Sequence, residues 1–297
     1  MKNSDFEIID LEIDEHGSFR QKKPKKEIPW LNIILFLLTL LTTTFAGTLF
    51  SGKDPFIVRN LLSGLPFSIP LLTILLFHES GHYLLSKKYN VEASLPYFIP
   101  APSFIGTFGA IIKMKSNINS KNALIDIGTA GPISGFVVSI PFLVYGIAKS
   151  EIVQKIPESS IKLGDFLLIR VLIKLIWGDL PENTDLMLHP VAFAGWLGCF
   201  VTAMNLFPIG QLDGGHISYA FFPKMSVIIS KLFIFILFLL GFFAWEGWFI
   251  WAFLLVILGT KHPPVLDENE PITPIRKILG LISLIVFILT FIPAPFQ

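Results

Sequence analysis

The sequence predicts an all-α, polytopic membrane protein with about seven transmembrane helices and a short re-entrant β segment around residues 94–115. Composition is the first reason: 53% of the 297 residues are hydrophobic and 29 are phenylalanine. Only 15% are charged, whereas soluble domains average about 25%. In addition, several apolar runs approach the roughly 20 residues that a helix needs to cross a bilayer. The lipid bilayer is therefore the expected solvent.

A polar tail, residues 1–29, precedes the first apolar run, which extends from Trp30 to about Phe50. Four lysines lie just before this run, so the positive-inside rule predicts a cytoplasmic N-terminal tail. Residues 30–297 are expected to form one transmembrane domain with a core at about 60–220. The further spans are expected at about residues 61–85, 123–148, 190–210, 226–243, 245–259 and 278–292.

Two connections depart from this helical pattern. Prolines between residues 94 and 102 break helices, and Gly106–Lys115 has the pattern of one or two short strands. Irregular backbone near a membrane needs protein or a water-filled cavity around it. The longest internal polar insertion, residues 149–189, contains the apolar stretch Ile161–Trp177, which predicts an interfacial helix on the non-cytoplasmic side.

Charge and cysteine content exclude two classes of protein. The net charge is only +1 and no basic stripe alternates with aromatic residues, so nucleic acid is not an expected partner. Cys199 is the single cysteine, which excludes a cysteine-rich zinc module. A bound metal would need histidine and carboxylate ligands.

The strongest chemical signal is His78-Glu79-Ser80-Gly81-His82, near the cytoplasmic end of the second expected span. On a helix, residues four apart lie about 40° from each other, so one metal ion can contact both imidazoles. Glu79, the next residue, projects about 100° around the helix from His78. That position suits a carboxylate that takes a proton from a metal-bound water rather than binding the metal itself. Ionisable side chains are costly inside a span, and they therefore indicate function.

A catalytic zinc ion normally has three protein ligands and one open position. Asp213 is the best candidate for the third ligand, because it follows the fourth expected span at the same depth as the histidines. Pro208 and Gly210 interrupt the helix just before it. One Zn²⁺ per chain, held by His78, His82 and Asp213, is the resulting prediction.

These residues give the chain a resemblance to the site-2 protease family of intramembrane zinc metalloproteases. The resemblance rests on His78-Glu79-x-x-His82 and on Asn205-x-x-Pro208-x-x-x-x-Asp213-Gly, with further similarity to the bacterial and chloroplast branch over about residues 60–220. It implies that Glu79 is the general base and that Asn205 orients the substrate or stabilises an oxyanion. It also implies a substrate that is a transmembrane helix, cut in regulated intramembrane proteolysis with the active site toward the cytoplasm.

The resemblance includes the strand-like segment, which would pair with an unwound substrate by strand addition. No PDZ-type insertion is visible in the sequence. Many family members have an asparagine shortly after the Gly-Pro of the third core span, but Ser134 and Gly135 stand there in this chain. The substrate role of that asparagine is therefore not transferred.

Two other functions compete with proteolysis. Histidine and aspartate in spans can line an ion path, as in a metal transporter. Alternatively, a relative of the proteases could bind substrate helices without cutting them, although the intact Glu79 argues against this. His216 is expected to be solvated or to support a metal ligand, and His16, His189 and His262 read as ordinary surface residues. The sequence predicts neither the substrate nor the oligomeric state.

Overall fold

A computed structural model describes residues 11–13, 19–21, 28–154 and 162–296 of the chain. Most of these residues are helical, which confirms the predicted all-α membrane fold. The longer helices are α1 (Trp30–Phe50), α2 (Leu65–Lys88), α3 (Lys121–Ala148), α5 (Pro190–Asn205), α7 (Ser226–Phe243), α8 (Gly247–Leu258) and α9 (Pro274–Thr290). Shorter elements are the 3₁₀ helix η1 (Val58–Gly64), α4 (Leu167–Trp177) and α6 (Asp213–Phe221).

A helix is present at each of the seven expected spans, but the helices differ in length. Among the described residues, four segments are long and apolar enough to cross a membrane: Trp30–Phe50, Val58–Lys88, Lys121–Ala148 and Ser226–Phe243. The helices α5, α8 and α9 have 16, 12 and 17 residues. The fourth expected span, 190–210, ends early at Asn205 because the following Pro-Gly segment leaves the helix.

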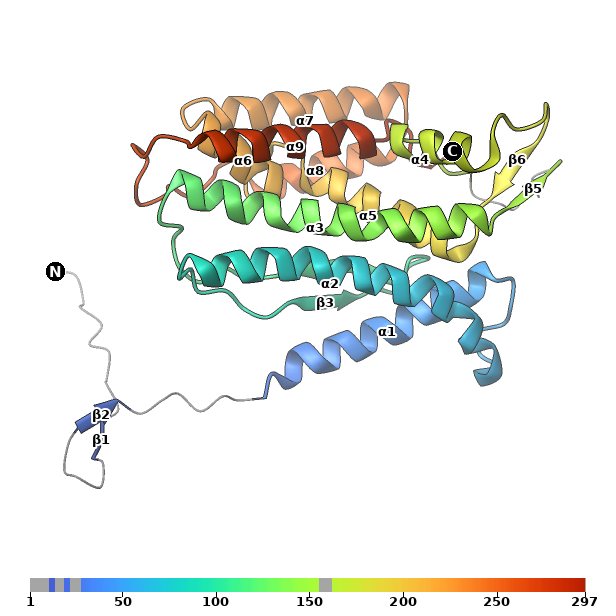
Figure 1. Cartoon of the computed structure of the whole chain (residues 1–297), viewed down its shortest axis with the longest axis horizontal. Helices are drawn as coiled ribbons and strands as arrows, with labels where there is room; N and C mark the ends of the chain where they lie inside the picture. Colours follow the sequence, from blue (N-terminus) through green and yellow to red (C-terminus); the bar gives the residue numbers. More distant parts are fainter. Residues whose placement is uncertain (1–10, 14–18, 22–27, 155–161, 297) are drawn as a thin grey trace.

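The long helices lie in layers along the long axis of the molecule (Figure 1). Helices α2 and α3 run side by side, α1 crosses beneath α2, and α7 and α9 lie on the opposite side of α3. Three glycines allow α2 and α3 to touch: a Cβ on Gly81 would lie 2.5 Å from the Ala130 carbonyl oxygen, and Gly131 and Gly135 face the histidines. Small residues on α3 therefore allow the close approach of the two helices.

The predicted β segment is a hairpin of β3 (Tyr97–Pro100) and β4 (Thr107–Ile111), paired antiparallel. It lies against α1, where Phe36 and Phe98 pack edge to face with centroids 5.0 Å apart. The Thr42 hydroxyl donates to the Gly106 carbonyl at 2.6 Å. These contacts hold the hairpin against α1, and β4 also contacts α2.

The insertion at 149–189 is only partly the helix that its composition predicts. Helix α4 begins at Leu167 rather than at Ile161, which itself lies outside the described residues. The strands β5 (Glu151–Val153) and β6 (Asp185–Met187) close the insertion as an antiparallel pair. The polar tail falls largely outside the described residues, which include the unpredicted antiparallel strands β1 (Leu11–Ile13) and β2 (Phe19–Gln21).

Candidate metal centre

The two histidines lie one helical turn apart in the second half of α2 and are almost fully buried. His82 is fixed by α3, because its Nδ1 lies 2.8 Å from the Ile127 carbonyl oxygen. A carbonyl can only accept a hydrogen bond, so Nδ1 carries the proton and Nε2 is directed elsewhere. A Cβ on Gly131 would lie 2.0 Å from this Nε2. Glycine at position 131 is therefore required for the observed position of the imidazole.

Asp213 reaches the histidines through a break between α5 and α6. After Asn205 the chain turns at Pro208 and Gly210, and Gly210 adopts φ +51°. A Cβ at Gly210 would lie 2.2 Å from the Gly259 carbonyl oxygen. The break then ends at Asp213, the first residue of α6. The expected end of the fourth span is thus a separate short helix, whose first turn carries the carboxylate.

The three predicted ligands converge on one point. The Nε2 atoms of His78 and His82 are 3.3 Å apart. The Asp213 carboxylate lies 3.2 Å from His78 Nε2 through Oδ2 and 3.1 Å from His82 Nε2 through Oδ1. The side chains of the two histidines and Asp213 are 4%, 6% and 13% exposed. A carboxylate and two imidazoles thus lie together with little exposure to solvent.

This geometry fits a zinc ion. Zinc bonds to histidine and carboxylate are about 2.0–2.2 Å long, so neighbouring ligand atoms of a tetrahedral site lie about 3.3–3.6 Å apart. The separations of 3.1–3.3 Å lie at or just below the lower end of that range. Moreover, the lone pair of His82 Nε2 faces a carboxylate oxygen, and two acceptors repel unless a proton or a cation lies between them. The site is therefore chemically suited to a divalent metal ion.

The remaining predicted site residues line the same cavity, which has a volume of about 540 Å³. Glu79 is 5% exposed and borders the cavity with Ile111 and Ile112, the end of β4 and the next residue. The amide nitrogen of Asn205 lies 3.2 Å from His78 Nε2, at the rim of the ligand group. The other walls are residues 113–118, 211–213 and 262–265, together with His216. The cavity therefore joins the ligands, the carboxylate and the hairpin end.

His262 is the residue that sequence reasoning misjudged. It was expected on the surface, but its Nε2 lies 2.6 Å from Nδ1 of the buried His216, and its ring stacks on Tyr219 at 4.4 Å. His262 also lines the cavity. Its position depends on the loop between α8 and α9 returning to α6, and no local pattern predicts that contact. His216 is buried rather than solvated, and its Nδ1 pairs with His262.

Ser134 stands in the region where many family members have an asparagine, and its side chain makes contacts between α2 and α3. Its hydroxyl lies 2.8 Å from the Phe77 carbonyl oxygen on α2 and 2.7 Å from the Ala130 carbonyl oxygen on its own helix. The side chain is therefore engaged between two helices beside His78, and it is not among the residues that line the cavity.

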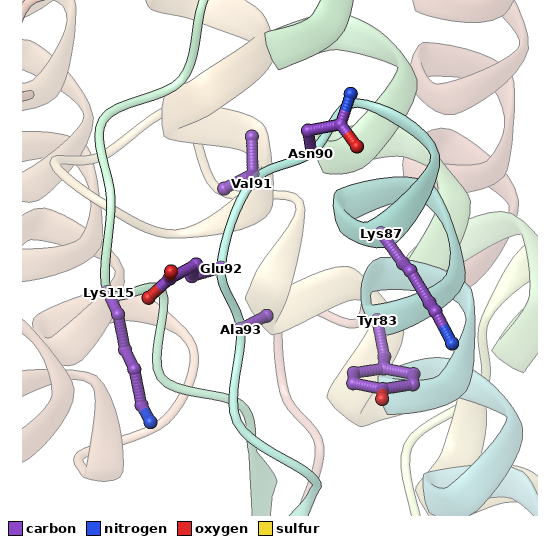
Figure 2. A pocket seen from close by; sticks show the side chains of 7 residues that line it. All are labelled: Tyr83, Lys87, Asn90, Val91, Glu92, Ala93 and Lys115. Carbon is purple, nitrogen blue, oxygen red and sulfur yellow. The ribbon is translucent and has the colours of Figure 1, made fainter. Parts of the chain in front are cut away.

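A second cavity, of about 470 Å³, lies at the end of α2. Figure 2 shows Lys87 and Lys115 on either side of Ala93, with Tyr83 beside Lys87. Glu92 supplies a single carboxylate to its lining, which contains no histidine. This cavity therefore has no ligand set for zinc, and the chemistry belongs to the first cavity.

Fold and site together define an integral membrane protein with a buried His-His-Asp group suited to hydrolytic metal chemistry. The model of peptidase family M50 matches residues 66–244, so the chain belongs to that family. The resemblance to the site-2 protease family is thereby confirmed at the level of the family.

Two relatives are similar over most of this chain. It is 31% identical over 239 residues to "Probable zinc metalloprotease EGY1, chloroplastic" of Arabidopsis thaliana, which covers 78% of this chain and 43% of that protein. It is 29% identical over 266 residues to "Probable zinc metalloprotease EGY2, chloroplastic" of the same plant, covering 84% and 47%. The chain thus spans less than half the length of these curated relatives. No solved structure is significantly similar to it.

Proposed function

We propose that this chain is an intramembrane zinc endopeptidase that hydrolyses peptide bonds in transmembrane helices of other proteins, in regulated intramembrane proteolysis. The observation that carries the proposal is the meeting of His78, His82 and Asp213 within 3.3 Å of one another, in a cavity that Glu79 also lines. His78, His82 and Asp213 would hold the zinc ion. When bound, the ion polarises the scissile carbonyl and lowers the pKa of water toward about 7.

Glu79 supplies the proton transfers of the reaction. Its carboxylate takes a proton from the attacking water as the oxygen bonds to the scissile carbonyl carbon. It then gives that proton to the amide nitrogen as the carbon–nitrogen bond breaks, so the products are a carboxylic acid and an amine, which exchange the remaining proton to give carboxylate and ammonium. Burial suits this role, because bulk water cannot compete for the proton. The Asn205 amide, next to His78, would donate a hydrogen bond to the substrate carbonyl oxygen.

The substrate must present an extended stretch, since a helical backbone hides its peptide bonds. Residues 110–118, beginning in β4, run along one wall of the cavity beside Glu79. An unwound substrate segment adding to this strand would bring its carbonyl to the metal centre. Lys113 and Lys115 line the same wall, which supports a cavity on the cytoplasmic side of the membrane with a cytoplasmic tail at the N-terminus.

The one-sided cavity favours a peptidase over a metal transporter. A transport path needs polar positions on both sides of the ion site. On α2, the turns that precede His78 carry the buried apolar residues Leu71, Leu72, Ile74 and Leu75. The cavity walls lie only on the other side, toward Lys113 and Lys115. Beyond those turns, the buried polar groups of the described residues are hydroxyls such as Ser68 and Ser139, which supply no charged ligand for a zinc ion.

The test is Glu79→Gln in the full chain, assayed by cleavage of a labelled single-span substrate in proteoliposomes. We expect cleavage to fall by about 100- to 10,000-fold, the usual contribution of general acid–base catalysis, while bound zinc per chain stays at the wild-type level. Glu92→Gln, an exposed carboxylate in the second cavity, is the matched control and should cleave normally. Undiminished cleavage by Glu79→Gln would refute the mechanism, and zinc uptake by the vesicles would favour transport.

A further inference from the structure

The last helix, α9, lies beyond residues 66–244 that match the peptidase family, yet it is bonded to the catalytic helices. In its first turn, the Arg276 guanidinium donates from Nε to Asp126 Oδ1 at 3.0 Å and from Nη2 to Asp126 Oδ2 at 2.7 Å. The Asp126 side chain on α3 is 9% exposed. A two-pronged, charge-assisted contact of this kind fixes orientation as well as distance.

Tyr89, the residue that follows α2, completes a three-residue network with this ion pair. Its hydroxyl donates to Asp126 Oδ2 and accepts a hydrogen bond from Arg276 Nη2 at 2.9 Å. The hydrogen bonds to Asp126 raise the pKa of Arg276 above its usual range, so the guanidinium keeps its charge. The ends of α2, α3 and α9 therefore meet at one nearly buried carboxylate.

A second contact fixes the chain that leads into α9. The Asn122 amide on α3 donates to the Pro271 carbonyl at 3.0 Å, and the Thr273 backbone N–H donates to Asn122 Oδ1 at 3.1 Å. Asn122 lies one turn before Asp126 on the same helix. The start of α9 is thus held on α3 at two successive turns, and Arg276 is delivered to Asp126 by an anchored backbone.

The network lies directly beside the contact that orients a metal ligand. Ile127, whose carbonyl accepts from His82 Nδ1 at 2.8 Å, follows Asp126 in α3. His82 and Tyr89 are seven residues apart in the sequence, about two helical turns, and so face α3 from the same side of α2. The two helices are therefore joined by His82 to Ile127 and by Tyr89 to Asp126 at adjacent residues. A shift at the second contact moves the first.

We propose that Arg276 is a positioning residue: acting through Asp126 and Tyr89, it holds the Ile127 carbonyl opposite His82 and so sets how tightly the centre binds zinc. The inference rests on the proposed zinc site. Without the guanidinium, the nearly buried Asp126 carboxylate loses its cation and must move toward water. That movement displaces the first turns of α3, and the imidazole loses the acceptor that aligns it. Contacts of this kind behind a ligand typically change metal affinity 10- to 100-fold.

Zinc affinity of the full chain, measured in detergent by competition with a chelator of known affinity, tests this directly. We expect Arg276→Gln to weaken zinc binding by roughly tenfold or more. Arg276→Lys keeps the charge but loses the two-pronged contact, and should fall between Arg276→Gln and the wild type. Lys277→Gln removes a neighbouring exposed charge from the same helix and should bind zinc like the wild type.

A purely structural role predicts a different outcome. In that case Arg276→Gln lowers the unfolding temperature of the chelated protein but leaves zinc affinity within twofold of Lys277→Gln, and the proposal is overturned. If Arg276→Gln does not fold, Tyr89→Phe decides, with Tyr145→Phe on the exposed face of α3 as control; equal zinc affinities of these two overturn it. A wild-type chain that binds no zinc refutes the proposed centre itself, which separates the two failures.

Discussion

The contact between α2 and α3 and the hairpin of α7 and α8 use opposite compositions for the same task of joining two helices. Between α2 and α3, glycines and buried polar groups bring backbones together around His78 and His82. In the hairpin, phenylalanine rings fill the space, as where Phe242 and Phe249 pack edge to face at 4.8 Å. Many of the hairpin's large side chains, such as Phe243, are exposed toward the expected lipid.

The comparison indicates where this fold tolerates change. A polar ligand buried in an apolar surrounding has few positions in which it is satisfied, so its neighbours must have one size and one orientation. Aromatic side chains between helices can adjust by rotating, and lipid adapts to what lies outside them. Function should therefore be far more sensitive at small residues of the first contact than at large residues of the second.

The largest effect is expected from Gly131→Ala. The added methyl group would lie 2.0 Å from His82 Nε2, and the ring cannot move away without breaking its bond to Ile127. We expect zinc affinity to fall by about 100-fold, the upper end for changes around a ligand, with cleavage lost in parallel. Chelator competition measures the first and the proteoliposome assay the second.

Gly241→Ala in α7 is the matched control. The atoms nearest its new methyl group belong to the Phe249 ring, at 2.7–2.8 Å, which is the end of a side chain in the hairpin. Overpacking here should cost about 1–3 kcal/mol of stability at most and leave zinc affinity unchanged. Equal loss of zinc binding in both variants would mean that the two contacts do not differ as described.

The sequence predicts the parts of this molecule that depend on local spacing. The four-residue interval of His78 and His82 places them on one helical face. Placing ionisable side chains inside a membrane span costs free energy, which marks these histidines as functional. Asp213 follows from the need for a third ligand and from the helix break at Pro208. Neither inference requires knowledge of distant contacts.

What could not be predicted depends on segments that meet only in three dimensions. Asp126 and Arg276 are separated by 150 positions, and each alone resembles an ordinary charge at a helix end. His262 likewise looks like a loop residue until α6 places His216 beside it. The start of a new helix at Asp213, rather than the end of an old one, is set by tertiary packing around Gly210.

An intermediate effect is expected from His262→Ala, because this residue lines the cavity and pairs with the buried His216. The substitution removes the hydrogen-bond partner of His216 Nδ1 and the ring that stacks on Tyr219. Leaving one buried polar group unpaired typically costs about 1–3 kcal/mol. Thermal unfolding of the chelated protein should show that loss, whereas Lys261→Ala, next to it and exposed, should not. An unchanged unfolding temperature for His262→Ala would show that the contact with His216 contributes no stability.

The smallest effect is expected at Phe243, the last residue of α7, whose side chain is 85% exposed. Its ring contacts the surroundings rather than the protein, so Phe243→Ala should change stability by less than about 0.5 kcal/mol and leave cleavage unchanged. Trp248→Ala in α8 is the informative partner, because that side chain is 0% exposed and donates to the Pro293 carbonyl at 2.6 Å. Truncating a buried tryptophan typically costs about 3–5 kcal/mol. If thermal unfolding showed equal losses for both variants, the outer face of the hairpin would be a protein contact surface rather than a lipid-facing one.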